Sequence, residues 1–247
     1  MELYIFGVLG AVLIGIAKTG VPGVGIAAVP LLATAVESVY PGTGAKLSVG
    51  WLLPMLIVAD IWAVSKYWRH TDWSIMKKLV PWIALGLVVG FLFYSKIKAE
   101  DFKPMLGVLV LVMLGLDLLR RAGRMTAVPN HPAFTGFVGT ATGASTALAN
   151  LAGPVMNVYF LCLGLNKVRF MATGAVLFFL VNLSKVPFFL WNGGISPESL
   201  MFNLKMIPAI CVGAVLGFWL LPRVPQKVFD GLVTFFVVAS AIKLLAF

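Results

Sequence analysis

Residues 15–30 read GIAKTGVPGVGIAAVP, a run of small residues and prolines that interrupts an apolar segment extending over residues 3–35. An unbroken helix over that segment would be about 50 Å long, too long for one comfortable span of a hydrocarbon core of about 30 Å. Each arm beside the break would be only about 22 Å long, which is too short to cross. The stretch therefore favours a re-entrant hairpin of two short helices, with full crossing as the alternative.

The rest of the chain is also strongly apolar. Hydrophobic residues make up 60% of the 247 positions, charged residues only 11%, and the mean hydropathy is +1.00. A soluble domain of this size could not bury so many apolar side chains. We therefore predict an all-α polytopic membrane protein with no separate soluble domain. The predicted spans cover residues 47–66, 79–96, 104–120, 170–191, 204–222 and 228–246.

The chain reads as two copies of one design. A second irregular apolar segment, residues 133–163 with a break around Gly143 to Pro154, precedes the fourth span as residues 3–35 precede the first. Glycines and prolines recur at an offset of 127, which relates Pro81 to Pro208, Gly86 to Gly213 and Gly90 to Gly217. The glycine pairs indicate close helix packing. We predict an N-terminal transmembrane repeat over residues 1–120, a basic cytoplasmic linker over residues 121–132 and a C-terminal transmembrane repeat over residues 133–247.

The distribution of Lys and Arg tests the hairpin model, because cytoplasmic loops carry an excess of both. With two re-entrant hairpins, 11 basic residues fall on the face of the linker and 6 on the other. With two crossing segments the split is 9 against 8. The re-entrant model thus places both termini on the non-cytoplasmic side. It gives each repeat three crossings, so the repeats would be inverted, whereas full crossing would make them parallel. The basic loops also account for the net charge of +10 without nucleic acid.

Lys18 is the most informative polar residue of the first break. A Lys at bilayer depth costs on the order of 2.5–3.5 kcal/mol. Beside it, Thr19 could cap the following helix, and the backbone N–H groups of Gly20 and Gly23 could point into a cavity where a helix N-terminus favours an anion. These residues predict a substrate-binding site for an anion. The alternative is a Lys that extends to the membrane interface.

The second break offers hydroxyls and amides without charge. Ser145, Thr146 and Asn150 could donate hydrogen bonds to the same anion if the two hairpin tips meet from opposite sides. Asn157 is a weaker binding candidate, and Asn157 and Asn182 also suit hydrogen bonds between helices. The alternative for the hydroxyls is that they bond back to carbonyls of their own helix.

Asp60 and Lys185 are the other ionisable residues well inside spans, and they occupy corresponding spans of the two repeats. They could form a structural ion pair, or Asp60 could carry a proton in a coupled cycle. The two histidines lie singly in loops and the two cysteines are isolated, so we predict no metal and no cofactor. No set of residues suited to hydrolysis is present, so an enzyme is not expected.

At the two breaks the sequence resembles the sulfite exporter TauE/SafE family, which overlaps with the 4-toluene sulfonate uptake permeases. The resemblance rests on residues 15–30 and on the stretch KVRFMATG at residues 167–174. The duplicated organisation and the length also fit this family, so the resemblance covers essentially the whole chain. The resemblance implies transport of sulfite, organosulfonates or related small anions, often as export driven by an ion gradient, in a bacterial inner membrane.

We therefore expect a secondary transporter that binds a small sulfur anion at the midplane between two broken hairpins and works by alternating access. H⁺ or Na⁺ would be the coupling ion, and the lipid bilayer the surrounding medium. The alternatives are an anion channel and a membrane subunit of a larger assembly. The sequence gives neither the substrate nor the oligomeric state.

Overall fold

The computed structural model describes residues 2–94 and 132–246, with positions 96, 111, 114, 115 and 122 between them. Within these residues the chain forms helices and turns only, which confirms the all-α prediction. The elements are α1 (Glu2–Thr19), η1 (Val24–Ala27), α2 (Ala28–Glu37), α3 (Gly44–Tyr67), η2 (Trp68–His70), α4 (Trp73–Phe93), α6 (Pro132–Ala149), α7 (Ala152–Cys162), α8 (Lys167–Trp191), α9 (Pro197–Arg223) and α10 (Gln226–Ala246). The predicted span 104–120 and nearly all of the predicted linker lie outside the described residues.

Four helices in the described part of the chain are long and apolar enough to cross a membrane. They cover Lys46–His70, Trp73–Phe93, Lys167–Trp191 and Pro197–Arg223, and they overlap the predicted spans 47–66, 79–96, 170–191 and 204–222. Their outer faces expose large apolar side chains, among them Leu92 on α4 and Leu204 on α9, both more than 60% exposed. Such surfaces suit contact with lipid. Helix α10 occupies the last predicted span, 228–246.

Both irregular segments form two helices around a break, as predicted. Helix α1 ends at Thr19 and the chain resumes helical structure in η1 and α2, while α6 and α7 flank the second break. That break lies at Asn150 and Leu151, inside the predicted stretch from Gly143 to Pro154, and Ser145 and Thr146 belong to the last turns of α6. Asn150 adopts a left-handed φ of 55°, and the Leu151 N–H donates to the Ser145 carbonyl, which closes the helix end.

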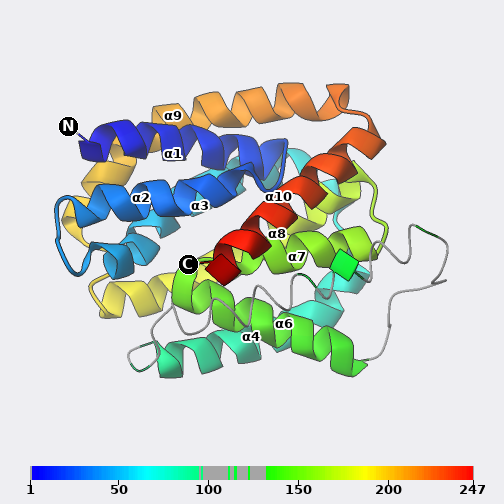
Figure 1. Cartoon of the computed structure of the whole chain (residues 1–247), viewed down its shortest axis with the longest axis horizontal. Helices are drawn as coiled ribbons and strands as arrows, with labels where there is room; N and C mark the ends of the chain where they lie inside the picture. Colours follow the sequence, from blue (N-terminus) through cyan, green and yellow to red (C-terminus); the bar gives the residue numbers. More distant parts are fainter. Residues whose placement is uncertain are drawn as a thin grey trace. The chain divides into compact units, whose positions relative to one another are not determined.

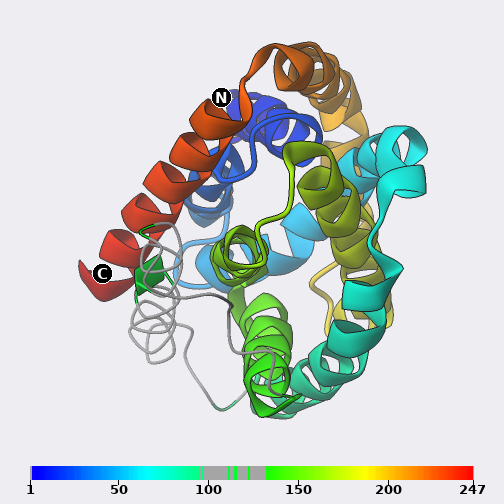
Figure 2. The same cartoon turned by 90° about the vertical axis from the view of Figure 1, so that its right-hand side faces the viewer.

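The helices group into two compact units that interleave the two sequence repeats. Unit 1 contains Met1–Thr71 and Gly174–Val224, and unit 2 contains Asp72–Thr173 and Pro225–Phe247. In unit 1 helix α1 runs beside α9, and in unit 2 helix α4 runs beside α6 (Figures 1 and 2). Each unit thus pairs the first helix of one repeat with a span of the other. The repeat boundaries themselves stay a prediction from the sequence.

Repeat-related glycines make both helix pairs close. A Cβ on Gly213 or Gly217 of α9 would meet Val12 or Thr19 of α1. A Cβ on Gly86 of α4 would likewise meet the backbone of α6. Small residues let helix backbones approach when lipid provides no hydrophobic drive for association. The two Gly-x-x-x-Gly pairs therefore perform the packing that their spacing predicts, one in each unit.

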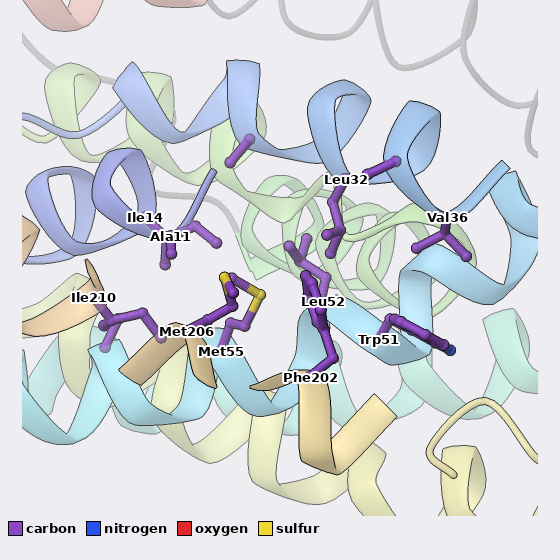
Figure 3. Packing of buried hydrophobic residues seen from close by; sticks show 13 residues of the cluster. Ala11, Ile14, Leu32, Val36, Trp51, Leu52, Met55, Phe202, Met206 and Ile210 are labelled. Atoms are coloured by element: carbon purple, nitrogen blue, oxygen red, sulfur yellow. The ribbon is translucent and has the colours of Figure 1, made fainter. Parts of the chain in front are cut away.

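The core of unit 1 holds four helices together. Side chains of α1, α2, α3 and α9 converge on one cluster, in which Trp51, Met55 and Met206 are at most 3% exposed (Figure 3). The Trp51 ring also packs against Phe202, with centroids 5.6 Å apart. Close packing of this kind resists displacement of any one helix. It therefore fixes α1 against α3, the two helices that carry Lys18 and Asp60 of the candidate site.

Candidate ion-pair site in unit 1

Asp60 is the centre of the charged cluster. It lies near the middle of the candidate span Lys46–His70 and is fully buried. The Lys18 ammonium lies 2.7 Å from its Oδ1 as an ion pair, although Oδ1 accepts no hydrogen bond of ordinary geometry. The Asn182 amide Nδ2 donates to Oδ2 at 2.7 Å. Asp60 thus joins three helices: α1 through Lys18, its own helix α3, and α8 through Asn182.

Lys18 is paired with Asp60 and is also partly exposed. It occupies the last turn of α1, where the negative end of the helix dipole favours a cation. Its ammonium also lies over the Phe178 ring, 4.6 Å from the centroid, a favourable cation–π geometry. The Lys18 side chain keeps 15% of its exposure, whereas Asp60 keeps none. Of this pair, only the Lys18 side chain has surface that a ligand could contact.

Lys185 of α8 is the second fully buried ionisable residue in the described part of unit 1. Among the buried residues of the described chain, Asp60 is the only one that carries a carboxylate. The sequence offered an ion pair between Asp60 and Lys185 as one possibility; the structure shows the Asp60 carboxylate paired with Lys18.

The end of α1 is held rigidly beside this cluster. The Thr19 hydroxyl lies 2.9 Å from the Gly15 carbonyl and 2.8 Å from the Ala214 carbonyl of α9, to which it donates. The Tyr67 hydroxyl donates to the Thr19 carbonyl at 2.7 Å. Thr19 was expected to cap the helix after the break. That expectation is wrong, because Thr19 is the last residue of α1 and its hydroxyl bonds backwards.

The glycines of the first break determine the backbone conformation at the end of α1. The Gly20 N–H donates to the Ile16 carbonyl at 2.8 Å, and Gly20 contacts Gly217 of α9. Gly23 takes a φ of 103°, which an L side chain rarely adopts, and turns the chain into η1. The N–H of Gly20 is thus engaged within the helix end. Its observed part is to let the end of α1 approach Gly217 of α9 closely.

The polar residues predicted for the second hairpin belong to unit 2. Ser145 is fully buried, and its hydroxyl donates to the Thr142 carbonyl at 2.9 Å, which is the back-bonding alternative. Thr146 and Asn157 are also buried, at 3% and 5% exposure. Asn150 forms the helix end. Their part in binding an anion stays a prediction.

Two aromatic residues at the site, Phe178 under the Lys18 ammonium and Tyr67 on the Thr19 carbonyl, were not identified from the sequence. Phe178, Asn182 and Lys185 follow the spacing i, i+4, i+7, which places them on one face of α8. That spacing was a signal that could have led to Phe178. Tyr67 gave no comparable signal, because its contact with Thr19 depends on how α1 lies against α3. Asn182 does form the hydrogen bond between helices for which it was suited.

The described residues contain no cluster of three or more His, Cys, Asp or Glu side chains suited to a metal ion. A search of curated proteins and a search of solved structures gave no significant match. A family model described as sulfite exporter TauE/SafE matches residues 7–244, nearly the whole chain. The chain therefore belongs to the TauE/SafE family of sulfite exporters, which are membrane transporters and not enzymes.

Proposed function

We propose that this protein is a secondary transporter that exports a small anion, such as sulfite or an organosulfonate, and that the anion binds beside Lys18 in unit 1. The observation that carries the proposal is the ion pair between Lys18, at the end of the apolar helix α1, and Asp60, which is fully buried in the candidate span Lys46–His70. Ionisable residues at membrane depth are costly and mark substrate or ion pathways. The partly exposed ammonium of Lys18 suits a negatively charged substrate.

Lys18 is the group best suited to contact the anion. Its ammonium has three N–H donors, and its side chain is the part of the Lys18–Asp60 pair with exposed surface. An ammonium–oxyanion hydrogen bond is a charge-assisted contact, stronger than a neutral one. The break after Thr19 supports this role, because irregular backbone at membrane depth is tolerated where it is buried in protein or lines a cavity.

The finer features of the transport cycle belong to the proposal. Alternating access would follow from movement of one repeat against the other around the bound anion. Ser145, Thr146, Asn150 and Asn157 of the second hairpin stay candidate anion-binding residues predicted from the sequence. The excess of basic residues in the predicted inner loops supports insertion with both termini on the non-cytoplasmic side. We assign the protein to a bacterial inner membrane from the family it belongs to.

Uptake into proteoliposomes tests the proposal. The wild type is offered sulfite, sulfate, thiosulfate, methanesulfonate and short carboxylates, and counterflow of the accumulated anion is measured to separate a carrier from a channel. Lys18→Met removes one charge-assisted contact, worth about 1.5–3 kcal/mol. We expect the affinity for the anion to fall roughly 10- to 150-fold.

Two further variants make the result specific. Lys66→Met removes an exposed Lys from the same helix as Asp60 and should leave uptake unchanged. Lys18→Met leaves Asp60 without its partner, which costs stability, so Lys18→Met/Asp60→Asn removes both charges of the pair together. Full affinity in a folded Lys18 variant, or no uptake of any anion by the wild type, would refute the assignment.

A further inference from the structure

Helices α3 and α9 of unit 1 run parallel and end together. Near their N-terminal ends the Trp51 ring packs against Phe202, with centroids 5.6 Å apart. The same number of residues further along both helices, the Tyr67 ring packs against Phe218, again with centroids 5.6 Å apart. These two contacts keep the helices in register, so their C-terminal ends lie side by side.

The two C-terminal ends carry the same exposed pair of side chains. The Trp that follows each contacting ring is exposed, Trp68 to 49% and Trp219 to 55%. The guanidinium carbon of Arg69 lies 5.7 Å from the centroid of the Trp68 ring, and that of Arg223 lies 4.1 Å from the Trp219 ring. Both are cation–π contacts. Neither Arg forms an ion pair within the described part of the chain.

The surface beside these pairs is apolar. Large exposed apolar side chains precede Trp68 on α3 and Trp219 on α9, namely Ile61, Trp62, Val212, Val215 and Leu216. Trp is enriched where the hydrocarbon core meets the lipid headgroups, and Arg extends from that level toward water. The order apolar surface, Trp, Arg therefore places both pairs at one membrane interface, on the face that the basic loops predict to be cytoplasmic.

The acidic side chains that the structure describes in unit 1 lie away from these pairs. Asp60 is fully buried. Glu37 ends α2 just before the start of α3, and Glu198 lies in the first turn of α9, so both belong to the opposite end of the two helices. The next acidic residue after α3, Asp72, belongs to unit 2, where it caps α4 and forms an ion pair. The end with the Arg–Trp pairs thus favours an anionic partner.

We propose that the C-terminal ends of α3 and α9 bind the phosphate group of an anionic phospholipid through Arg69 and Arg223. A guanidinium has five N–H donors and binds phosphate oxygens in pairs. Arg223 donates one of its hydrogen bonds to the Trp219 carbonyl at 2.7 Å, which fixes its position and leaves other donors for the ligand. The Trp rings would contact the glycerol backbone and the upper part of the acyl chains.

A lipid suits this surface better than a soluble phosphate. The exposed apolar side chains of α3 and α9 continue directly from the two Trp rings, so acyl chains can cover them while the headgroup meets the guanidinium groups. The cytoplasmic leaflet is also the one rich in anionic lipids. This site is separate from Lys18 and goes beyond the proposed transport function.

Native mass spectrometry of the full chain in detergent tests the proposal. The probe is phosphatidylglycerol, and phosphatidylcholine with the same acyl chains is the zwitterionic comparison. Each Lys or Arg near an anionic lipid surface contributes about fivefold in binding. We expect the wild type to bind phosphatidylglycerol more tightly than phosphatidylcholine. Arg69→Gln/Arg223→Gln should weaken phosphatidylglycerol binding roughly 30-fold and leave phosphatidylcholine binding unchanged.

Two further pairs of substitutions separate a site from general charge. Lys46→Gln/Lys205→Gln removes the same charge from exposed side chains nearer the opposite end of α3 and α9, and phosphatidylglycerol binding should stay as in the wild type. Arg69→Lys/Arg223→Lys keeps the charge but removes the paired donors, so a partial loss is expected. Circular dichroism checks that each variant is folded.

Three results would overturn the proposal. The first is equal binding of phosphatidylglycerol by the wild type and the Arg69→Gln/Arg223→Gln variant. The second is an equal loss in the Lys46→Gln/Lys205→Gln control, which would show that total charge is responsible. The third is displacement of the bound lipid by an equal concentration of glycerol 3-phosphate, which would identify a soluble phosphate as the ligand. If the double Arg variant does not fold, Arg223→Gln alone should lose about fivefold, and unchanged binding there refutes the site.

Discussion

Gly217→Ala tests the link between helix packing and the site. The added Cβ would meet Thr19 Oγ1 and would lie 2.9 Å from the Gly20 nitrogen and 3.0 Å from the Ile16 carbonyl oxygen. Thr19 cannot yield freely, because its hydroxyl lies 2.8 Å from the Ala214 carbonyl and its own carbonyl accepts from Tyr67. The new methyl therefore has to push α1 and α9 apart beside Lys18.

The expected magnitude follows from three contributions. Overpacking costs about 1–3 kcal/mol, and loss of the Thr19 hydrogen bond about 0.5–1.5 kcal/mol. Alanine is more favourable than glycine in a helix by about 1 kcal/mol. The net cost is thus about 0.5–3.5 kcal/mol, or a fall of about 1–14 °C in Tm for a chain of this length.

Thermal unfolding in detergent and anion uptake are measured for Gly217→Ala and for Gly231→Ala. Gly231 lies in α10 with no atom within 4 Å of an added Cβ, so its substitution matches the change in helix propensity without the clash. We expect only Gly217→Ala to lower Tm and weaken uptake. Equal stability and equal uptake for the two variants would show that close approach of α1 and α9 does not position Lys18.

Two other changes give separate predictions. Asn182→Leu removes the donor to Asp60 Oδ2 and leaves a buried acceptor unsatisfied. We expect the free energy of unfolding to fall by about 1–3 kcal/mol. Asn192→Leu, at the exposed residue that follows α8, should have little effect. Asp72→Ala removes the side-chain cap of α4 and should lower the free energy of unfolding by about 0.5–2 kcal/mol. Arg169→Met removes only the half-exposed ion pair to Asp72 and should lower it by less than about 1 kcal/mol. Equal losses for the two variants would contradict the capping role.

The membrane spans and the breaks could be predicted because each depends on local composition. Hydropathy identified the four crossing helices, and Gly20 and Pro22 marked the first break. The second break could be predicted only as the stretch from Gly143 to Pro154, because α6 continues through Gly143 at the start of that stretch. Gly143 lets α4 approach, and Asn150 ends the helix instead.

The site was predictable residue by residue but not as a set. Lys18, Asp60 and Lys185 could each be identified because an ionisable side chain in an apolar span is costly. The sequence could not show that Asp60 pairs with Lys18, since that depends on which helix lies beside the end of α1. Packing of α1 with α3 and α9 decides this, and such contacts between distant segments have no local signature.

The pairing of α1 with α9 has a consequence for biogenesis. Val12 and its contact Gly213 are separated by about 200 residues, which the ribosome adds in roughly 10–40 s at 5–20 residues per second. Throughout that interval α1, with the buried Thr19 at its end, is already synthesised while the backbone it packs against does not yet exist. Until α9 has been synthesised, α1 therefore needs other packing partners, either in the translocon or in the lipid bilayer. A nascent chain stalled before α9 would expose Lys18 without the packing that positions it, and would be a natural substrate for membrane quality control.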